Sequence, residues 1–318
     1  MWLWDREIAG TRAQLAESHE LGQSVLTKHI SLGCTRQPRI AMQDIHELAD
    51  GELLRWAVFD ILDSQSVSSA IQMLRRLSDQ RKIIVKNIRE MPIPGSYLGA
   101  VMQLEDRIDI YCDLSRPEIV RQAILVHEIV HIVLSREGFP EIVVKENVSS
   151  DLPPQQQGLA TRLRDRFKSA IDHPEVFRRM TSTFELNLDS YFDAQVDQKL
   201  RMFQSGSKGK SWRDQDYYFE RQQDIMWGIE FFWYPSKQRD QILLAFQNTH
   251  PDSHQSCLSL YSKIKGIGFQ TPTSCYESAQ IMKSHIISYG ENRKTGAFNR
   301  MWEALHVRRP DMTSQSTV

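Results

Sequence analysis

The hydrophobic positions in the first quarter of the chain recur at the spacing of an α-helix. Residues 5–80 mix apolar and polar side chains in this way, and only Pro38 interrupts them. Residues 66–77 place Val67, Ile71, Leu74 and Leu77 along one helical face. An apolar stripe of this kind is typical of a helix that packs against a core. We therefore predict a helical segment that ends near residue 80.

The pattern then changes, and runs typical of β-strands replace the helical spacing. Residues 82–88 are rich in isoleucine and valine, and residues 107–112 alternate between polar and apolar positions. A third apolar run, residues 97–104, is separated from the first by the proline-containing stretch 91–96. β-Branched residues and alternation favour strands, whereas proline disfavours helix in its neighbours. These runs predict a small, mainly antiparallel sheet, with 107–112 as a half-buried strand.

A strongly apolar helix is predicted from about residue 117 to residue 135. Ser115 has the side chain of an N-cap, and Glu118 follows three residues later, at the spacing of a capping box. Pro117 is tolerated in a first helical turn, and Gly138 favours an end soon after the last apolar residue. Because most positions between these signals are apolar, we expect this helix to be buried.

The rest of the chain is predicted to be mostly helical. Two helices are expected at about residues 155–172 and 189–203, and the glycine- and serine-rich stretch 204–211 is expected to be an exposed linker. An aromatic-rich region at 214–235 and the shorter apolar runs that follow favour further helices.

These elements together predict an α+β fold that is mostly helical. A small antiparallel sheet packs on the helix of residues 117–135, and helical segments flank both. The predicted domains are an N-terminal helical segment at 1–80, a core containing the sheet and the apolar helix at 81–204, and a C-terminal helical segment at 205–318. A chain of 318 residues is long enough for more than one domain.

Composition excludes several classes of partner. The formal net charge is -1, with 25% charged and 41% hydrophobic residues, so no global charge favours nucleic acid or an anionic membrane. The first residues lack the pattern of a secretory leader, and no apolar run approaches the length of about 20 residues that a membrane span needs. The four cysteines are scattered, which is typical of a reducing compartment. We expect a cytoplasmic protein without a membrane partner, and the composition gives no clear signal for nucleic acid, although local basic patches remain possible.

The predicted apolar helix contains the sequence HExxH. Because residues i and i+4 of a helix stand on one face, His127 and His131 can bind one zinc ion together. Glu128 lies beside the first histidine, where it can take a proton from a water molecule and later deliver it to a leaving amine. The alternative is that both histidines are ordinary core residues. Burying them and a carboxylate in an apolar helix is costly without a partner, and a metal ion supplies one.

Three stretches carry a resemblance to a known family. They are Gly99-Ala100-Val101, Arg107-Ile108-Asp109-Ile110 and the run from Ile124 to Leu134 that contains HExxH. On these stretches the chain resembles the zincin-type metallopeptidases, most of all the ImmA/IrrE-like cytosolic metallopeptidases. The resemblance implies a short sheet followed by a zinc-binding helix, and hydrolysis of peptide bonds. It also implies that the strand from Tyr97 to Met102 is a sheet edge that pairs with extended substrate.

The third zinc ligand is left open by the motif. A catalytic zinc usually has three protein ligands, and the longer HExxHxxGxxH signature is absent, because Arg136-Glu137-Gly138 follows the second histidine. ImmA/IrrE-like proteins take a glutamate from a following helix, and this chain has no clean copy of that patch.

Downstream of the motif, four residues are candidates for this third ligand. His173 follows the predicted helix 155–172, from whose end it could turn into the site, although it could instead be a cap favoured by the helix dipole. Glu185 lies four residues before Asp189, and Asp193 repeats the spacing with a shorter acid. We take His173 as the provisional third ligand beside His127 and His131, with Glu185, Asp189 and Asp193 as alternatives.

Aromatic residues offer two further features. Tyr191 and Tyr217 could donate to an oxyanion, or they could be core residues. The aromatic cluster of the C-terminal segment could be a packed core, a peptide groove or a surface for a protein partner. Its members are Trp212, Tyr217, Tyr218, Phe219, Trp227, Phe231, Phe232, Trp233 and Tyr234.

Two functions fit these residues. The first is a cytosolic zinc metallopeptidase that cleaves a peptide bond of one specific intracellular protein, with zinc as cofactor and Glu128 as general base. The second is a non-enzymatic regulatory or defence protein that keeps a zinc-stabilised zincin fold and acts through its helical flanks. Hydrolysis of a non-peptide amide at the same metal is a third, weaker reading.

Overall fold

The computed structural model describes the second of two compact units into which the chain divides, residues 1–44 and 45–318. The described residues are 69–70, 72–73, 76, 82–91, 98–145, 154–193, 215–235, 237–291 and 296–309. Most of the predicted helical segment 1–80, the linker 204–211 and both predicted domain boundaries lie outside them. The predicted helix 189–203 is described as far as residue 193, and those five residues are helical.

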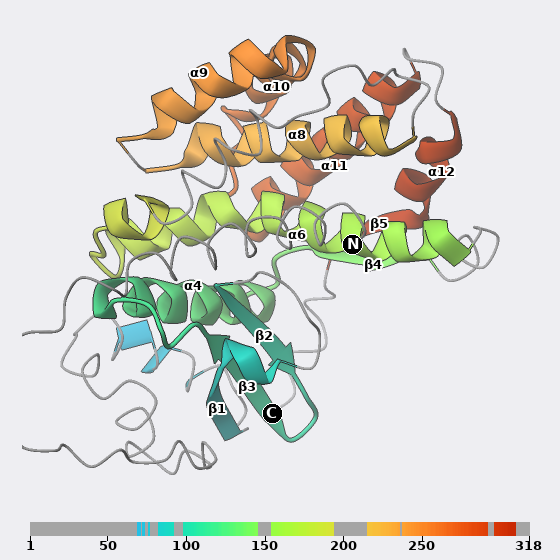
Figure 1. Cartoon of the computed structure of the whole chain (residues 1–318). Coiled ribbons are helices and arrows are strands. Elements are labelled where there is room, and N and C mark those ends of the chain that lie inside the picture. The colour runs from blue at the N-terminus through green and yellow to red at the C-terminus, as the bar shows by residue number, and fades with distance from the viewer. Residues whose placement is uncertain are drawn as a thin grey trace, which may run out of the picture. The chain divides into compact units, whose positions relative to one another are not determined.

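Within the described residues the fold is α+β and mostly helical, which confirms the predicted class (Figure 1). The strands are β1 (Lys82–Asn87), β2 (Gly99–Gln103), β3 (Arg107–Cys112), β4 (Glu141–Val144) and β5 (Leu305–Arg308). The helices are α4 (Glu118–Arg136), α6 (Pro154–Ser182), α8 (Gln215–Trp233), α9 (Arg239–Thr249), α10 (Pro251–Ile264), α11 (Pro272–Glu291) and α12 (Gly296–Ala304), with a short 3-10 helix at Ile88–Glu90. None of these helices has the length and apolarity needed to cross a membrane.

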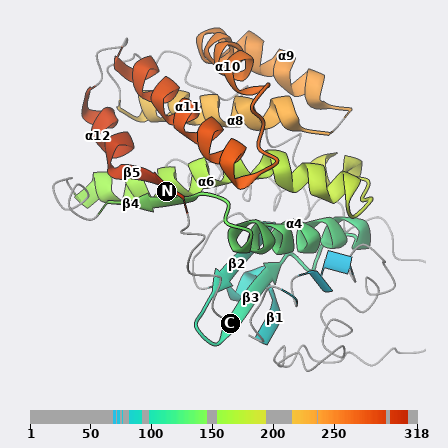
Figure 2. The ribbon, with the colours of Figure 1, turned by 180° about the vertical axis from the view of Figure 1, so that it is seen from behind.

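Helix α4 lies between a sheet and a second helix. Strands β2 and β3 pack on one side of it and α6 packs on another, as the two opposite views show (Figures 1 and 2). Helix α8 packs against α6, and α9, α10 and α11 in turn pack against α8. Because α4 is covered from both directions, twelve of its residues are buried, including His127 and Glu128.

The three-stranded sheet is mixed. Its order is β1-β3-β2, with β2 antiparallel and β1 parallel to β3. The predicted antiparallel pair β2–β3 is present, joined by a tight turn in which Leu104 N–H donates to the Arg107 carbonyl (2.8 Å). Successive strands run in opposite directions, so β1 and β3 point the same way. They form a parallel pair because β3 lies in the centre and β1 occupies the edge opposite β2. Alternation along one strand carries no information about the direction of its neighbours.

Strand β3 differs from the predicted half-buried strand. All its residues from Ile108 to Cys112 are buried, on both faces of the sheet. The polar Asp109 is 2% exposed, and its carboxylate is bound by Lys86 Nζ (2.7 Å) and Arg107 Nε (3.2 Å). A buried carboxylate needs such partners to offset its lost hydration. The alternating pattern was therefore wrong about exposure, because ion pairs allow the polar positions to be buried.

Helix α4 starts differently from the prediction. It begins at Glu118 after Pro117, and the cap position makes no side-chain hydrogen bond. The capping box is therefore wrong: Ser115 Oγ donates to Asp113, and Glu118 accepts from Gln122 Nε2 (3.2 Å). The predicted length is otherwise close, because apolar periodicity, unlike the cap, extends over the whole helix.

Helix α6 runs well past its predicted end at residue 172. It continues to Ser182 with Pro174 in its interior. Proline removes the N–H that would bond four residues back, which normally kinks or ends a helix. Here the turns beyond Pro174 bury Val176, Phe177 and Met180, all at most 2% exposed. We infer that this burial offsets the missing hydrogen bond, so His173 lies inside a helix instead of at its end.

The described aromatic residues of the C-terminal cluster pack within the molecule. Trp227, Phe231 and Tyr234 are buried. Phe232 stacks on Tyr261 with ring centroids 4.5 Å apart, and Trp233 meets Tyr261 and Phe269 edge to face (5.8 and 5.6 Å). These contacts agree with the packed-core interpretation. The side chains of Trp212, Tyr217, Tyr218 and Phe219 lie outside the described residues.

Candidate metal centre

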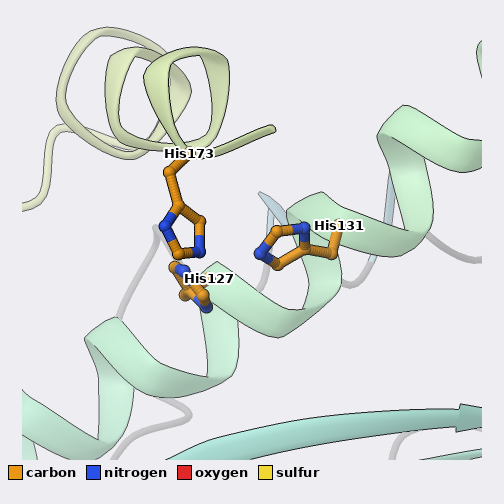
Figure 3. A group of neighbouring side chains, drawn as sticks. All are labelled: His127, His131 and His173. Carbon is orange, nitrogen blue, oxygen red and sulfur yellow. The ribbon is translucent and has the colours of Figure 1, made fainter. Parts of the chain in front are cut away.

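Three histidines from two helices converge in the interior. His127 and His131 stand one turn apart on α4, and His173 faces them from α6 (Figure 3). A ring nitrogen of each lies within 4.8 Å of a ring nitrogen of the other two. A tetrahedral zinc ion with Zn–N bonds of about 2.0–2.1 Å holds its nitrogens about 3.4 Å apart. Small side-chain rotations therefore suffice to bring all three nitrogens to one ion.

The alternative third ligands do not join this group. Glu185 is exposed and has a left-handed backbone (φ 53°) in the turn that follows α6. Asp189 lies 3.6 Å from Lys237 Nζ, and Asp193 accepts a hydrogen bond from Gln238. Among the described residues, only one cluster of histidine, cysteine or acidic side chains is arranged so that it could hold a metal ion. That cluster consists of His127, His131 and His173.

Two ring nitrogens at the centre make no hydrogen bond to the protein, Nε2 of His127 and Nδ1 of His173. His127 Nε2 is buried and makes no hydrogen bond. Its ring is flanked by Phe177 and Tyr191, with centroids 6.0 and 5.9 Å away, which supply no acceptor or donor to that nitrogen. Leaving such a group unsatisfied costs about 1–3 kcal/mol. Three imidazoles are a donor set suited to zinc and leave a fourth position open. The residues present thus fit the metal that the sequence predicts.

A buried ion pair orients His131. Asp172, only 1% exposed, places Oδ2 3.2 Å from His131 Nδ1, and Lys168 Nζ binds both carboxylate oxygens (2.7 and 2.6 Å). Burial alone would raise the pKa of Asp172, but Lys168 and His131 together hold it below its ordinary value. The ionised carboxylate can accept a hydrogen bond from Nδ1–H, which leaves Nε2 as the coordinating atom.

Glu128 lies at the centre beside the first histidine. Its Oε1 is 3.0 Å from His127 Nδ1, and the residue is 8% exposed. Burial would raise the pKa of Glu128, but the hydrogen bond and the nearby histidines lower it below its ordinary value. One carboxylate oxygen therefore orients His127, and the other, Oε2, is available to accept a proton from a water molecule.

Glu128 is held against β2 at a position that only glycine fits. A Cβ atom built on Gly99 would lie 2.6 Å from Ile124 Cγ2 and 2.7 Å from Glu128 Oε1. We expect Gly99→Ala to displace these side chains and to lower the free energy of unfolding by about 1–3 kcal/mol, the usual cost of overpacking. Urea denaturation of the two proteins measures this loss.

Gly158 supplies the matched control for this substitution. It is an exposed position of α6 where an added Cβ meets nothing within 4 Å. Gly158→Ala should stabilise the helix by about 0.5–1 kcal/mol, because alanine loses less backbone freedom than glycine on folding. If Gly99→Ala were as stable as Gly158→Ala, the close approach of β2 to Glu128 would be contradicted.

Burial of His127 makes the stability of the metal-free protein depend on pH. Burial, opposed by Glu128 and assisted by His131 and His173, lowers the pKa of His127 from 6.5 to about 4. Below pH 6.5 the unfolded chain takes up a proton that the folded chain refuses until about pH 4. The folded state thus has its full stability above pH 6.5 and loses about 3 kcal/mol through this residue as the pH falls towards 4.

The variant His127→Gln removes this titration. We expect the unfolding free energy of the metal-free wild type to fall more steeply between pH 6.5 and 4 than that of His127→Gln. Chemical denaturation across this range gives both slopes, and taking their difference cancels the other titrating groups. Equal slopes would show that His127 titrates alike in the folded and unfolded states.

Several residues of this centre were not predicted from the sequence. Asp172 precedes His173 directly, and with Lys168 it has the i, i+4 spacing of a helical ion pair. That spacing was a usable signal, although nothing local indicates that the pair faces His131. Glu230, whose Oε1 lies 3.3 Å from His173 Nδ1, comes from α8 and has no sequence signal. Tyr191, weighed as an oxyanion donor, does lie beside His127, whereas the side chain of Tyr217 is outside the described residues.

Comparison with known proteins adds no relative. No family model matches the chain, and neither the curated proteins nor the solved structures gave a match. The resemblance to zincin-type metallopeptidases therefore stays a prediction from the three sequence stretches that carry it.

Proposed function

We propose that this protein is a zinc-dependent hydrolase that cleaves a peptide bond, with Glu128 as general base. The observation that carries the proposal is the convergence of His127, His131 and His173 beside a buried glutamate. The orphaned Nε2 of His127 supports it, because a metal ion supplies the missing partner.

The residues divide the chemistry between them. The three histidines hold zinc, which when bound lowers the pKa of a water molecule and polarises a carbonyl. Glu128 takes a proton from the attacking water at Oε2 as the oxygen bonds to the carbonyl carbon. As the carbon–nitrogen bond breaks, Glu128 delivers that proton to the leaving amine. The hydrogen bond from His127 and the nearby histidines outweigh burial and favour the ionised form of Glu128, which is the form that can act as a base.

A peptide substrate is supported by the position of β2. Among the described residues β2 pairs with β3 alone, and an extended chain could add to the edge that no described strand occupies. Gly99 at the start of β2 lies against Glu128, so a peptide added to this edge would pass beside the general base. This arrangement favours a peptide over a small amide, which would gain nothing from a strand edge.

The proposal is tested by mapping new protein N-termini in a cell lysate. The protein is stripped of metal, then added to the lysate with and without one equivalent of zinc. We expect a small set of new N-termini that requires restored zinc. Rapid cleavage of many unfolded proteins would contradict a specific substrate. No zinc-dependent N-termini would favour the regulatory alternative, in which the helical flanks carry the function.

A further inference from the structure

A third buried carboxylate faces the metal centre, from helix α8 of the C-terminal segment. Glu230 of α8 is 1% exposed, and its Oε1 lies 3.3 Å from Nδ1 of His173. Its other oxygen, Oε2, lies 4.0 Å from Nη2 of Arg166 on α6. A buried carboxylate is retained at low cost only if neighbouring positive or donating groups compensate it. Arg166 is such a cation, and Nδ1 of His173 lies at ion-pair distance from the carboxylate without making a hydrogen bond to it.

Arg166 is itself held in place by α8. Its guanidinium carbon lies 3.7 Å from the centre of the Trp227 ring, a cation–π distance. Trp227 and Glu230 are three residues apart, so they share one face of α8. Burial lowers the pKa of Arg166 and Glu230 opposes this effect. Helix α8 thus supplies both the charge and the ring that accommodate this buried cation.

The arrangement around His173 resembles the one around His131, although only the Asp172 contact has the geometry of a hydrogen bond. In both, a carboxylate that is 1% exposed faces Nδ1, at 3.3 Å from Glu230 and at 3.2 Å from Asp172. In both, a cation from α6 lies beside that carboxylate, Arg166 in one case and Lys168 in the other. A carboxylate at Nδ1 fixes the ring orientation of a histidine and leaves Nε2 to coordinate.

We propose that Glu230, supported by Arg166, is a positioning residue that fixes His173 with Nε2 turned towards the metal. The inference rests on the proposed metal centre and deepens it. Helix α8, which belongs to the predicted C-terminal segment, then contributes to the metal centre through the side chain of Glu230. Zinc affinity therefore depends on a residue that touches neither the metal nor the substrate.

The test compares variants that keep the size of the side chain. Glu230→Met removes the carboxylate that faces Nδ1, whereas Glu230→Gln keeps an oxygen there and removes only the charge. Glu175→Met and Glu175→Gln are the matched controls. Glu175 of α6 is equally buried, and Arg178 and Arg179 bind its carboxylate (2.6 and 2.7 Å). Both sets of variants lose a buried ion pair, but only the first removes a partner of His173.

Zinc affinity is measured on the full chain by competition with a chelator, and cobalt absorption spectra report the ligand geometry. We expect Glu230→Met to weaken zinc binding about 10–100-fold and to alter the cobalt spectrum, as is typical of lost partners of ligand histidines. Glu230→Gln should fall between it and the wild type. The Glu175 variants should bind both metals as the wild type does. This graded order is not expected of a purely structural role.

Each outcome decides the inference. If the Glu230 variants bind zinc and cobalt like the Glu175 variants, the positioning role is wrong while the proposed function stands. If Glu230→Met does not fold, Glu230→Gln against Glu175→Gln gives the decision, with a severalfold weaker affinity expected only for the first. If the wild type binds no zinc, both the proposed function and this inference are overturned.

Discussion

Replacing Glu128 by glutamine is expected to lower the rate of peptide hydrolysis by about 100-fold to 10,000-fold, the range of a lost general base. Glutamine has the same shape, so it fits between Gly99 and His127 and can still accept from His127 Nδ1. It cannot take a proton from water. Zinc affinity should therefore stay within severalfold of the wild type while turnover is lost.

The measurement is cleavage of a peptide that spans one of the zinc-dependent sites found in the lysate. Glu118→Gln is the control, because Glu118 is an exposed glutamate at the start of the same helix and faces Gln122. It should cleave at the wild-type rate. If Glu128→Gln still cleaved the peptide at the wild-type rate, the Glu128 carboxylate would not be the general base. Unchanged cellular function of this variant, with zinc still bound, would favour the regulatory alternative.

Removing His173 is expected to have the largest effect on metal binding. His173→Ala deletes one of three nitrogen ligands and leaves Glu230 facing a cavity. We expect zinc affinity to fall more than about 100-fold, beyond the 10–100-fold that is typical when only a supporting partner is lost. The variants Glu185→Ala and Asp189→Ala should retain the wild-type affinity, because neither residue joins the trio.

Chelator competition with the purified proteins measures these affinities. His306→Ala is the control for loss of a histidine, since His306 is exposed on β5 and outside the group. If His173→Ala binds zinc as tightly as His306→Ala, the third ligand comes from elsewhere. If Glu185→Ala lost as much zinc affinity as is expected for His173→Ala, Glu185 would be the third ligand. A glutamate in that role is what the resemblance to ImmA/IrrE-like proteins implies.

The features predicted well from the sequence are those that local spacing determines. Helix α4 follows from its long apolar run, and the placement of His127 and His131 on one face follows from helical geometry. Strands β1, β2 and β3 were predicted for the same reason, whereas β4 and β5 were not predicted. The N-terminal cap of α4 was missed, because Ser115 finds a nearer acceptor in Asp113 and the helix starts after Pro117.

The features predicted poorly depend on contacts that are distant in sequence. The parallel pairing of β1 with β3 reflects the order of three strands, and the burial of Asp109 depends on Lys86 from the neighbouring strand. Helix α6 continues past Pro174 because tertiary burial outweighs a local rule. That continuation places His173 opposite α4 from within a helix, whereas the sequence predicted it at a helix end.

The carboxylates that face the ligand histidines, Asp172 and Glu230, could not be predicted from the HExxH motif. Asp172 and His131 are 41 residues apart in sequence, and Glu230 reaches His173 from another helix. Neither spacing belongs to a recurring pattern. A ligand histidine usually has an acceptor at Nδ1, and a buried carboxylate often fills this role. Such a carboxylate can therefore be expected from the motif, but the motif does not identify the residue.

The measurement that tests the central claim most directly is the zinc content of the purified protein after equilibrium dialysis against zinc. The wild type is compared with the double variant His127→Ala, His131→Ala and with the His306→Ala control. Our account predicts about one zinc ion per chain in the wild type and in the control, and none in the double variant. Equal zinc content in all three proteins, or none in the wild type, would contradict it.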